Sequence, residues 1–336
     1  MYSPNFIVEA MLKPETYPEP VSKIELIQTH ISFVFLTENY VYKIKKPVNF
    51  GFLDFSSLKK RHLYCEKELQ INKRLCPTLY LEVVSITNNS GILKMGGDGE
   101  AVEFAVKMRR LPQEQLMNKL LQKNKINDQI IDKLAAIIAN FHTNAQTNPE
   151  INTFGRLETI QTNWTENFTQ TQKYINQTIP QEDYDAIQQK INTFINKNPS
   201  LFEQRIADGR IRDCHGDLYS SNIFVADQIY IFDAIEFNDR FRYSDTASDV
   251  AFLAMDLDYQ NHQALSAYFI KQYITYAKDA ALSLMLPFYK CYRAYVRGKV
   301  VSFRLDDPNI CAQDKVAATK EASAYFRLAA KYALGL

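Results

Sequence analysis

The chain has 336 residues, and its 39 lysines and arginines nearly balance its 38 aspartates and glutamates. That length is enough for two domain-sized lobes. The net charge of +1 gives no electrostatic reason to expect a nucleic-acid or anionic-membrane partner, and no apolar run approaches the ~20 residues of a membrane span. The five cysteines form no C-x-x-C pair, and the N-terminus lacks the basic and apolar segments of a signal peptide. We therefore expect a cytoplasmic globular protein with reduced thiols and without a nucleic-acid or membrane partner.

Two strands joined by a tight turn are predicted near the N-terminus, at residues 31–37 and 39–45, because both segments are rich in β-branched and aromatic residues. The second strand carries Lys43 in a pattern similar to the Val-Ala-Ile-Lys strand of kinases, whose lysine contacts the nucleotide phosphates. Strand alternation places Lys45 on the same face, so Lys45 is the alternative, whereas Lys46 points the other way.

A helix is predicted after these strands, from about residue 56 to residue 75, because Pro77 stops the helical pattern. This helix contains two glutamates, Glu66 and Glu68, and either of them can serve as the partner of a strand lysine. A later alternating segment, residues 103–111, is predicted to be a strand that ends at a proline.

The chain beyond residue 112 is predicted to be mainly helical. In the first long helix, apolar residues recur at spacings of three and four, and His142 near its end is expected to be structural. Residues 147–200 are rich in Asn, Gln and Thr, which indicates an exposed insertion. The expected helices cover residues 130–146, 157–175, 182–196, 263–278, 287–303 and 315–336.

Residues 215–233 carry the most specific chemical pattern of the chain. A His-Gly pair precedes Asp217, Asn222 follows five residues after Asp217, and an apolar run ends at Asp233 eleven residues later. Alternating apolar residues within 222–232 suggest a small hairpin that would hold Asn222 and Asp233 on one rim. In phosphotransferases with a kinase-like fold, this spacing provides a base and two magnesium ligands. We therefore assign Asp217 as the base, and Asn222 and Asp233 as ligands of magnesium.

This motif resembles the aminoglycoside phosphotransferase-like branch of kinases, in which His-Gly-Asp replaces the His-Arg-Asp of protein kinases. Residues 29–36, 42–47, 51–55 and 249–257 further resemble an uncharacterised bacterial group of that branch, whose members are often fused to a C-terminal P-loop ATPase. The chain has no Gly-x-x-x-x-Gly-Lys-Ser/Thr motif of its own, so a separate P-loop ATPase is a candidate partner.

The resemblance implies an α+β, two-lobed, protein-kinase-like fold. It has a small antiparallel-sheet N-lobe and a larger, mostly helical C-lobe. We expect a nucleotide-binding lobe at residues 1–108, a hinge at 109–112 and a helical lobe at 113–336. The helical lobe would contain the catalytic loop, residues 215–222, and the metal motif, residues 230–233.

The resemblance also implies a nucleotide site. Glu68 is preferred as the partner of Lys43, because glutamates of this branch tend to precede a leucine by seven residues. The chain has no glycine before residue 51, so it lacks the glycine-rich phosphate loop of protein kinases. Hydroxyls of Thr29 and Ser32 are candidates for that role, or they simply pack in the strand. At the hinge, the C=O of Arg109 and the N–H of Leu111 are expected to hold the adenine edge.

Residues after the metal motif are expected to support the site. Asp249 corresponds to an aspartate that braces the catalytic loop in the family. Glu236 is a candidate for a second magnesium or for the substrate, and is equally consistent with a turn charge. Arg293, Arg297 and Arg304 recur on about one helix face, which either closes on the substrate or braces the lobes.

The predicted function is transfer of the γ-phosphate of ATP, or alternatively GTP, to a hydroxyl of a small molecule with the help of Mg²⁺. Two other functions stay open at this point. One is a protein kinase, although the chain lacks the activation segment of that class. The other is a pseudokinase or nucleotide-sensing module that acts with a separate P-loop ATPase. The amide-rich insertion argues against an aminoglycoside, because a polycation requires clustered carboxylates.

Overall fold

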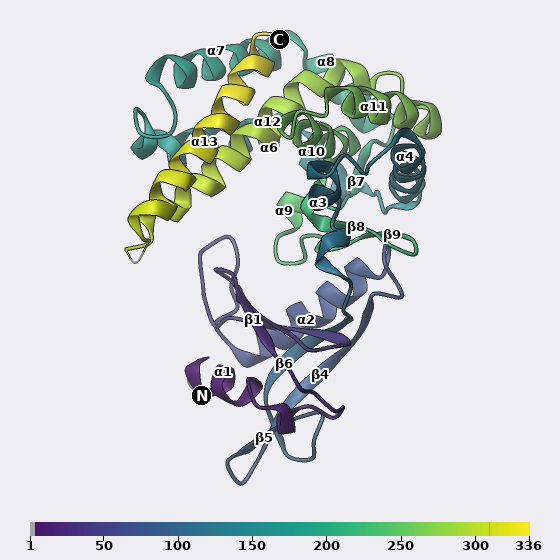
Figure 1. Ribbon diagram of the computed structural model, residues 1–336. Helices are drawn as coiled ribbons and strands as arrows, with labels where there is room; N and C mark the ends of the chain where they lie inside the picture. Colours follow the sequence, from purple (N-terminus) through teal and green to yellow (C-terminus); the bar gives the residue numbers. More distant parts are fainter. Residues whose placement is uncertain (1–3, 309) are drawn as a thin grey trace. The chain divides into compact units, whose positions relative to one another are not determined.

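The computed structural model describes residues 4–308 and 310–336 (Figure 1). The chain divides into two compact units, which we call the sheet unit and the helical unit. The sheet unit contains Met1–Lys119 and Ser221–Asp239, and the helical unit contains Leu120–Ser220 and Arg240–Leu336. The segment that follows the predicted catalytic aspartate therefore groups with the N-terminal part of the chain. All five cysteines are free thiols. Among the described residues, no helix is long and apolar enough to cross a membrane.

The sheet unit is built on an antiparallel sheet that has six strands in the described part of the chain, in the order β1-β2-β3-β6-β4-β5. The β2–β3 hairpin matches the expected pair of strands around a tight turn, and β6 matches the strand expected at 103–111. The strands are β1 (Glu25–Gln28), β2 (Ser32–Leu36), β3 (Tyr40–Lys45), β4 (Tyr80–Asn89), β5 (Ile92–Met95) and β6 (Glu100–Arg109).

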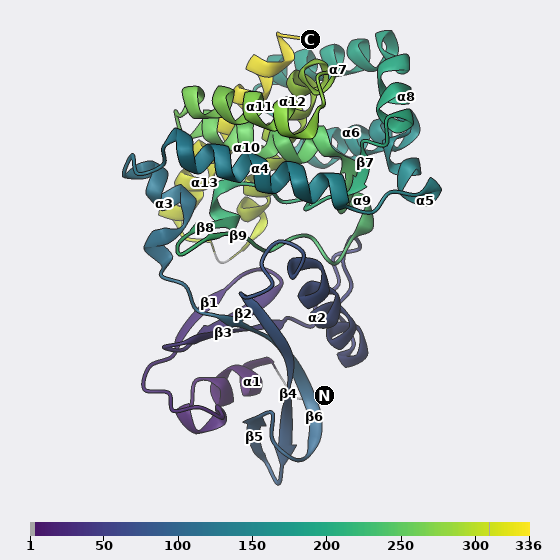
Figure 2. The same cartoon turned by 90° about the vertical axis from the view of Figure 1, so that its right-hand side faces the viewer.

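Each face of the sheet covers its own apolar core. On one face, α1 (Pro4–Met11) packs against residues that include Tyr42 and Ile44 of β3. On the other face, α2 (Leu58–Asn72) and Val41 of β3 contribute to a second core. Figure 2 shows the two helices beside the sheet. Because successive strand residues point to opposite faces, Val41, Lys43 and Lys45 all face α2.

The helix α2 starts where the sequence indicates. Ser57 caps its N-terminus by accepting a hydrogen bond from the N–H of Lys60. Its buried positions are Arg61, Cys65, Glu68 and Asn72, so three of the four residues on its inner face are polar. Polar residues on the inner face indicate that α2 contributes a site to the unit as well as packing.

The sheet unit also contains a small hairpin formed by β8 (Ile223–Val225) and β9 (Ile229–Ile231). Phe224 and Tyr230 of this hairpin belong to the same core as α2. The hairpin therefore anchors the segment between Asn222 and Asp233 on the sheet unit.

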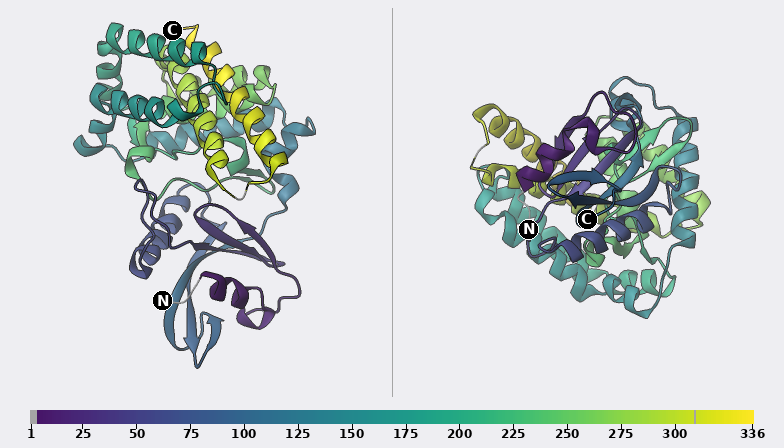
Figure 3. Two further views of the ribbon diagram at one scale, coloured as in Figure 1. Left: turned by 90° about the vertical axis from the view of Figure 1, so that its left-hand side faces the viewer. Right: turned by 90° about the horizontal axis from the view of Figure 1, so that it is seen from below.

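The helical unit packs around α10, in which twelve consecutive residues from Thr246 to Leu257 are buried. The helix α12 contacts both α10 and α13, and Figure 3 shows α13 running alongside α12. The short strands β7 (Ile211–Asp213) and β10 (Tyr243–Asp245) pair next to the predicted catalytic loop. The helices, including two that cross the boundary between the units, are α3 (Met117–Gln122), α4 (Asp128–Asn144), α5 (Pro149–Asn152), α6 (Leu157–Thr171), α7 (Gln181–Lys197), α8 (Pro199–Ala207), α9 (Asp239–Arg242), α10 (Thr246–Tyr259), α11 (Gln263–Ala277), α12 (Leu282–Ser302) and α13 (Ala312–Ala333).

The expected helices are present with shifted ends, and α12 shows the clearest difference. It was expected to begin at Pro287, but it begins five residues earlier, at Leu282. Proline inside a helix removes one hydrogen bond and crowds the preceding turn. Here Leu282 and Met285 are fully buried, and their packing holds the preceding turn in helical form despite the proline.

Candidate active site

Two lysines of β3 converge on one glutamate of α2. Lys43 Nζ lies 2.8 Å from Glu68 Oε1, and Lys45 Nζ lies 2.6 Å from Glu68 Oε2. Each lysine also contacts a second carboxylate. Lys43 Nζ lies 2.6 Å from Asp233 Oδ1, and Lys45 forms a short ion pair with Glu236. The sequence left Lys43 and Lys45 as alternatives, and the structure brings both to Glu68.

The other candidate glutamate of α2 lies on the opposite side of the helix. The Glu66 side chain is 54 % exposed, and its Oε1 lies 3.5 Å from His62 Nε2. Residues two apart on a helix differ in direction by about 200°, so only one of the two glutamates can face the sheet. Glu68 is that residue and is fully buried.

The charges of this cluster stabilise one another. Burial by itself raises the pKa of Glu68, but the two adjacent ammonium groups outweigh burial and hold that pKa below its ordinary value. Burial lowers the pKa of Lys43, whereas the charges of Asp233 and Glu68 raise it well above its ordinary value. Glu68 and Lys43 are therefore both charged at neutral pH. A partly buried ammonium that stays charged is suited to bind phosphate oxygens.

Asp233 has an unusual backbone conformation two residues after the end of β9, which ends at Ile231. Its φ is +65°, in the left-handed region that aspartate adopts more easily than most residues. Its N–H donates to the Tyr80 hydroxyl at 3.3 Å, and the next N–H, that of Ala234, donates to Asn72 Oδ1 at 2.9 Å. These bonds fix the turn, while the Asp233 side chain remains 41 % exposed. The carboxylate is thus held in place and still accessible.

Asn222 is connected to this turn through the backbone. Its carbonyl accepts a hydrogen bond from the N–H of Phe232 at 3.0 Å, so Asn222 and Asp233 stand at the same end of the β8–β9 hairpin. A carboxylate and a carboxamide offer the hard oxygen ligands that Mg²⁺ prefers, and Asp233 has solvent access for them. This donor set fits magnesium. When bound with a nucleotide, the ion would neutralise phosphate charge.

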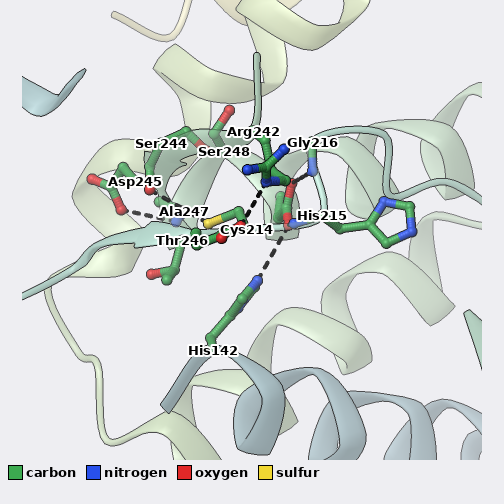
Figure 4. Close-up of polar contacts among 12 residues, drawn as sticks. His142, Cys214, His215, Gly216, Arg242, Ser244, Asp245, Thr246, Ala247 and Ser248 are labelled. Carbon is green, nitrogen blue, oxygen red and sulfur yellow. Dashed lines mark hydrogen bonds and ion pairs between the residues drawn. The ribbon is translucent and has the colours of Figure 1, made fainter. Parts of the chain in front are cut away.

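The loop that carries Asp217 belongs to the helical unit, and hydrogen bonds from its backbone to Asp249 hold it in place. Gly216 has a φ of +85°, a conformation that a side chain would strain, and the N–H of Asp217 donates to His215 Nδ1 at 3.2 Å. Asp249 accepts hydrogen bonds from the N–H groups of His215 at 2.7 Å and Gly216 at 3.0 Å. Figure 4 shows His142 pointing toward this loop, and its Nε2 lies 3.3 Å from Asp249 Oδ2.

Asp249 remains ionised although it is fully buried. Burial alone raises its pKa, but its hydrogen bond to His142 and the charges of His142 and Arg293 lower the pKa to about 2. Ligand atoms of His142, Cys214 and Asp249 lie within 4.8 Å of one another, a spacing that metal sites also show. The Asp249 oxygens already accept two backbone hydrogen bonds, and His142 Nδ1 lies 2.8 Å from the Tyr273 hydroxyl. We therefore describe this group as a brace for the loop.

The three arginines singled out in the sequence have different surroundings. Arg293 donates to the carbonyl of Gly216 at 2.8 Å, so it supports the loop. Arg304 lies after α12 and pairs with Glu321 at 3.5 Å. Arg297 lies against the ring of Tyr219, two residues after Asp217.

The remaining predicted nucleotide contacts lie within the sheet unit. Arg109 uses its side chain to contact Tyr230 of the β8–β9 hairpin, and its N–H donates to Leu79. Leu111, the other predicted adenine contact, lies two residues after β6, and its N–H donates no hydrogen bond to any described residue. The hydroxyl of Thr29 accepts from the N–H of Ser32 at 2.9 Å and closes the turn before β2, while Ser32 Oγ is buried and has no hydrogen-bond partner among the described residues.

Sequence reasoning missed the support that comes from Tyr80 and Asn72. Asn72 lies four residues after Glu68 on α2. Residues four apart share a helix face, so this spacing could have placed Asn72 beside Glu68. Tyr80 follows a loop and had no such signal. Glu236 was weighed for magnesium or substrate, and the structure buries it against Lys45.

The amide-rich insertion contains a cavity of about 370 Å³ between α6 and α7. Trp164, Phe168 and Tyr184 are its aromatic lining residues, and amides and hydroxyls make up most of the rest. No Asp, Glu, Lys, Arg or His residue is among the described residues that line it. The cavity therefore offers no acid, base or charged ligand for a phosphoryl group.

These features are typical of a phosphotransferase with a kinase-like fold. They are a β3 lysine paired with a helical glutamate, a His-Gly-Asp loop held by Asp249, and an aspartate that follows a hairpin strand. Comparison with known proteins gives the family. The model of the Phosphotransferase enzyme family matches residues 37–282, which is most of the chain. The chain therefore belongs to this family, as the resemblance of its motifs indicated.

Curated relatives include uncharacterised proteins of Mycobacterium tuberculosis and Mycobacterium bovis. Each is 32 % identical to this chain over 282 residues. The match covers 84 % of this chain and 55 % of each relative, so the chain spans about half the length of the curated relatives it matches. Their names give no activity.

Solved structures confirm the expected two-lobed kinase-like fold class. A choline/ethanolamine kinase family protein from Mesorhizobium loti aligns with a TM-score of 0.56 and 12 % identity, over 98 % of this chain and 99 % of that one. A candidate aminoglycoside phosphotransferase from Ralstonia eutropha aligns with a TM-score of 0.55 and 13 % identity, over 100 % of this chain and 99 % of that one. At such identities the likeness concerns the fold alone.

Proposed function

We propose that this protein transfers the γ-phosphate of ATP, with GTP as the alternative donor, to a hydroxyl group of a small molecule with the help of Mg²⁺. The observation that carries the proposal is the cluster in which Lys43 contacts both Glu68 and Asp233. Phosphoryl transfer depends on positioned charges, and this cluster offers a partly buried cation next to an accessible carboxylate.

Each residue has a proposed role. Asp217 accepts or orients the proton of the attacking hydroxyl. Asn222 and Asp233 hold magnesium, and Lys43, oriented by Glu68, binds the phosphates. The N–H of Leu111 is free of other hydrogen bonds within the described chain, which supports its proposed contact with the adenine edge, together with the C=O of Arg109. A phosphate contact from Ser32 belongs to the same proposal, although the Ser32 hydroxyl is buried.

The setting of the reaction is part of the proposal. Use of ATP and five free thiols both agree with a cytoplasmic protein. The boundaries we propose are a nucleotide lobe at 1–108, a hinge at 109–112 and a helical lobe at 113–336 that contains the catalytic loop, 215–222, and the metal motif, 230–233. The curated relatives are longer than the matched region, which agrees with a kinase module that acts with a second domain or a separate protein, such as a P-loop ATPase.

The test is a thermal-shift titration of ATP and GTP, with and without Mg²⁺, on the wild type, Asp233→Ala and Asp227→Ala. A nucleotide that binds the folded state raises the melting temperature. We expect a magnesium-dependent shift that disappears in Asp233→Ala. Asp227 is an exposed carboxylate on the turn of the same hairpin, so Asp227→Ala is the matched control and should keep the shift. If neither nucleotide binds the wild type, the proposal is wrong.

A further inference from the structure

Arg297 of α12 is a charged side chain without a charged partner. Among the described residues, no carboxylate lies within 4 Å of its guanidinium, and its Nε is buried without a hydrogen-bond partner. The neighbouring arginines differ, because Arg293 lies 3.7 Å from Asp249 and Arg304 lies 3.5 Å from Glu321. A guanidinium that is partly removed from water and has no charged partner raises the free energy of the folded protein, unless a bound anion neutralises it.

Aromatic rings hold this guanidinium in one place. It lies 4.9 Å from the ring centroid of Tyr219 and 5.5 Å from that of Tyr325. Both rings are themselves stacked, Tyr219 on Phe252 at 5.3 Å and Tyr325 on Tyr259 at 3.9 Å. Cation–π contacts of this kind orient an arginine and leave its N–H groups available at the edge of the plane.

The position of Arg297 relates it to the proposed catalytic base. It follows Arg293 by one helical turn, and Arg293 binds the carbonyl of Gly216, the residue before Asp217. The ring under Arg297 belongs to Tyr219, two residues after Asp217. One face of α12 therefore contacts the loop on both sides of Asp217.

The charges around Arg297 leave it cationic. Burial lowers the pKa of Arg297, but Tyr219, Tyr325 and the charge of Asp217 raise it above its ordinary value. Asp256 is the other nearby carboxylate, and it accepts hydrogen bonds from Ser220 at 2.9 Å and Gln260 at 3.0 Å. Asp256 is therefore engaged with other donors.

We propose that Arg297 is the specificity-determining residue of the acceptor site and binds an anionic group, a carboxylate or a phosphate, on the hydroxyl compound that is phosphorylated. This inference rests on the proposed function and narrows it to acidic acceptors. A guanidinium binds carboxylate and phosphate oxygens through two parallel N–H donors, whereas a neutral alcohol offers no group that would neutralise it.

The test compares acceptors that share a skeleton and differ in charge. The probes are glycerol, glycerate and glycerol 3-phosphate, together with glucose, gluconate and glucose 6-phosphate. Binding is measured first by thermal shift without nucleotide, at low ionic strength, on the wild type, Arg297→Gln, Arg297→Lys and Arg304→Gln. Phosphorylation of each probe by ATP is then measured as kcat/KM. Arg304→Gln is the matched control, because Arg304 pairs on the partly exposed outside of the unit.

We expect at least one acid to bind the wild type about 10- to 100-fold more tightly than its parent alcohol, as charged hydrogen bonds allow. That preference should vanish in Arg297→Gln, persist in part in Arg297→Lys and be unchanged in Arg304→Gln. The class of acid that binds more tightly than its parent alcohol, carboxylate or phosphate, identifies the anion that Arg297 binds. The proposal is overturned if no acid exceeds its alcohol, or if Arg297→Gln weakens acids and alcohols equally, which would indicate a purely structural residue.

The two proposals fail in different ways. If the wild type binds acids through Arg297 but shows no nucleotide shift, phosphoryl transfer is wrong and the anion site stands. If nucleotide binds with magnesium but no probe acid is preferred, the kinase stands and the role of Arg297 is wrong. Should Arg297→Gln fail to fold, the charge-retaining Arg297→Lys decides the matter through its partial preference for acids.

Discussion

Replacement of Glu68 by glutamine tests the charge cluster on which the proposed site depends. The substitution keeps the size of the side chain, replaces one acceptor oxygen with an NH2 donor, and removes the charge that two lysines share at 2.8 Å and 2.6 Å. Removing one member of a buried ion pair costs about 3–5 kcal/mol, because the remaining charge is left uncompensated. Here Lys43 keeps Asp233 and Lys45 keeps Glu236, so we expect the lower end, about 3 kcal/mol.

Hydrogen exchange measures this loss where it occurs. A loss of about 3 kcal/mol corresponds to roughly 100-fold faster exchange of amides that open with the unit. We expect this acceleration in β3 and α2. The single tryptophan, Trp164, lies on α6 of the helical unit, so its fluorescence during urea unfolding reports separately whether that unit is affected.

Glu66→Gln is the matched control, with the same chemical change two residues away on the same helix. Glu66 is exposed and pairs with His62 across one helical turn, and such exposed pairs contribute about 0–1 kcal/mol. Exchange in β3 and α2 should therefore stay within a few-fold of the wild type. Equal effects of the two substitutions would refute the reasoning, because they would show that the shared carboxylate does not stabilise the cluster.

Two further substitutions address the helical unit. Asp217→Asn should keep the nucleotide-induced thermal shift and lose turnover by several orders of magnitude, measured as ADP release with a competent acceptor; full turnover would exclude Asp217 as the base, and loss of nucleotide binding would indicate a structural role. Asp249→Asn should remove an acid-dependent step in stability, because the folded pKa of about 2 lies below the ordinary value of 3.8. With that sign, Asp249 contributes about 2 kcal/mol above pH 4, and the contribution is lost as the pH falls toward 2, so unfolding free energies measured between pH 2 and pH 6 should converge for wild type and mutant at the acid end.

The sheet face could be predicted from the sequence because strand alternation is a strong rule. It places Lys43 and Lys45 on one face of the strand and Lys46 on the other. The choice between Glu66 and Glu68 was harder, because the inner face of α2 carries Arg61, Glu68 and Asn72 beside Cys65. A helix with polar residues on its buried face has no clear apolar stripe, so its orientation cannot be derived from hydrophobic periodicity alone.

Residues in irregular segments could not be assigned in this way. Glu236 follows the turn at Asp233 and lies outside any helix or strand, so no periodic pattern indicates where its side chain points. A magnesium ligand and a turn charge were therefore equally consistent with the sequence. Burial against Lys45 results from contacts between segments 191 residues apart in the chain. Arg297 posed the opposite problem, because helical periodicity grouped it with Arg293 and Arg304. The environment distinguishes them, since the other two arginines have carboxylate partners.

The gradation of exposure within the lysine–glutamate cluster suggests how it can accept a ligand without losing its form. Lys45, Glu68 and Glu236 are almost completely buried, whereas the side chain of Lys43 is 15 % exposed and that of Asp233 is 41 % exposed. Exchanging the partner of a half-exposed carboxylate costs far less than breaking a buried pair. The Lys43–Asp233 contact is therefore the one that ligands can replace: Lys43 can bind the phosphates of a nucleotide, and Asp233 can bind magnesium. Meanwhile Lys45 and Glu236 keep Glu68 in position. On this reasoning, Lys45→Met should impair the orientation of Glu68 and weaken nucleotide binding, although Lys45 itself is too deeply buried to touch a phosphate.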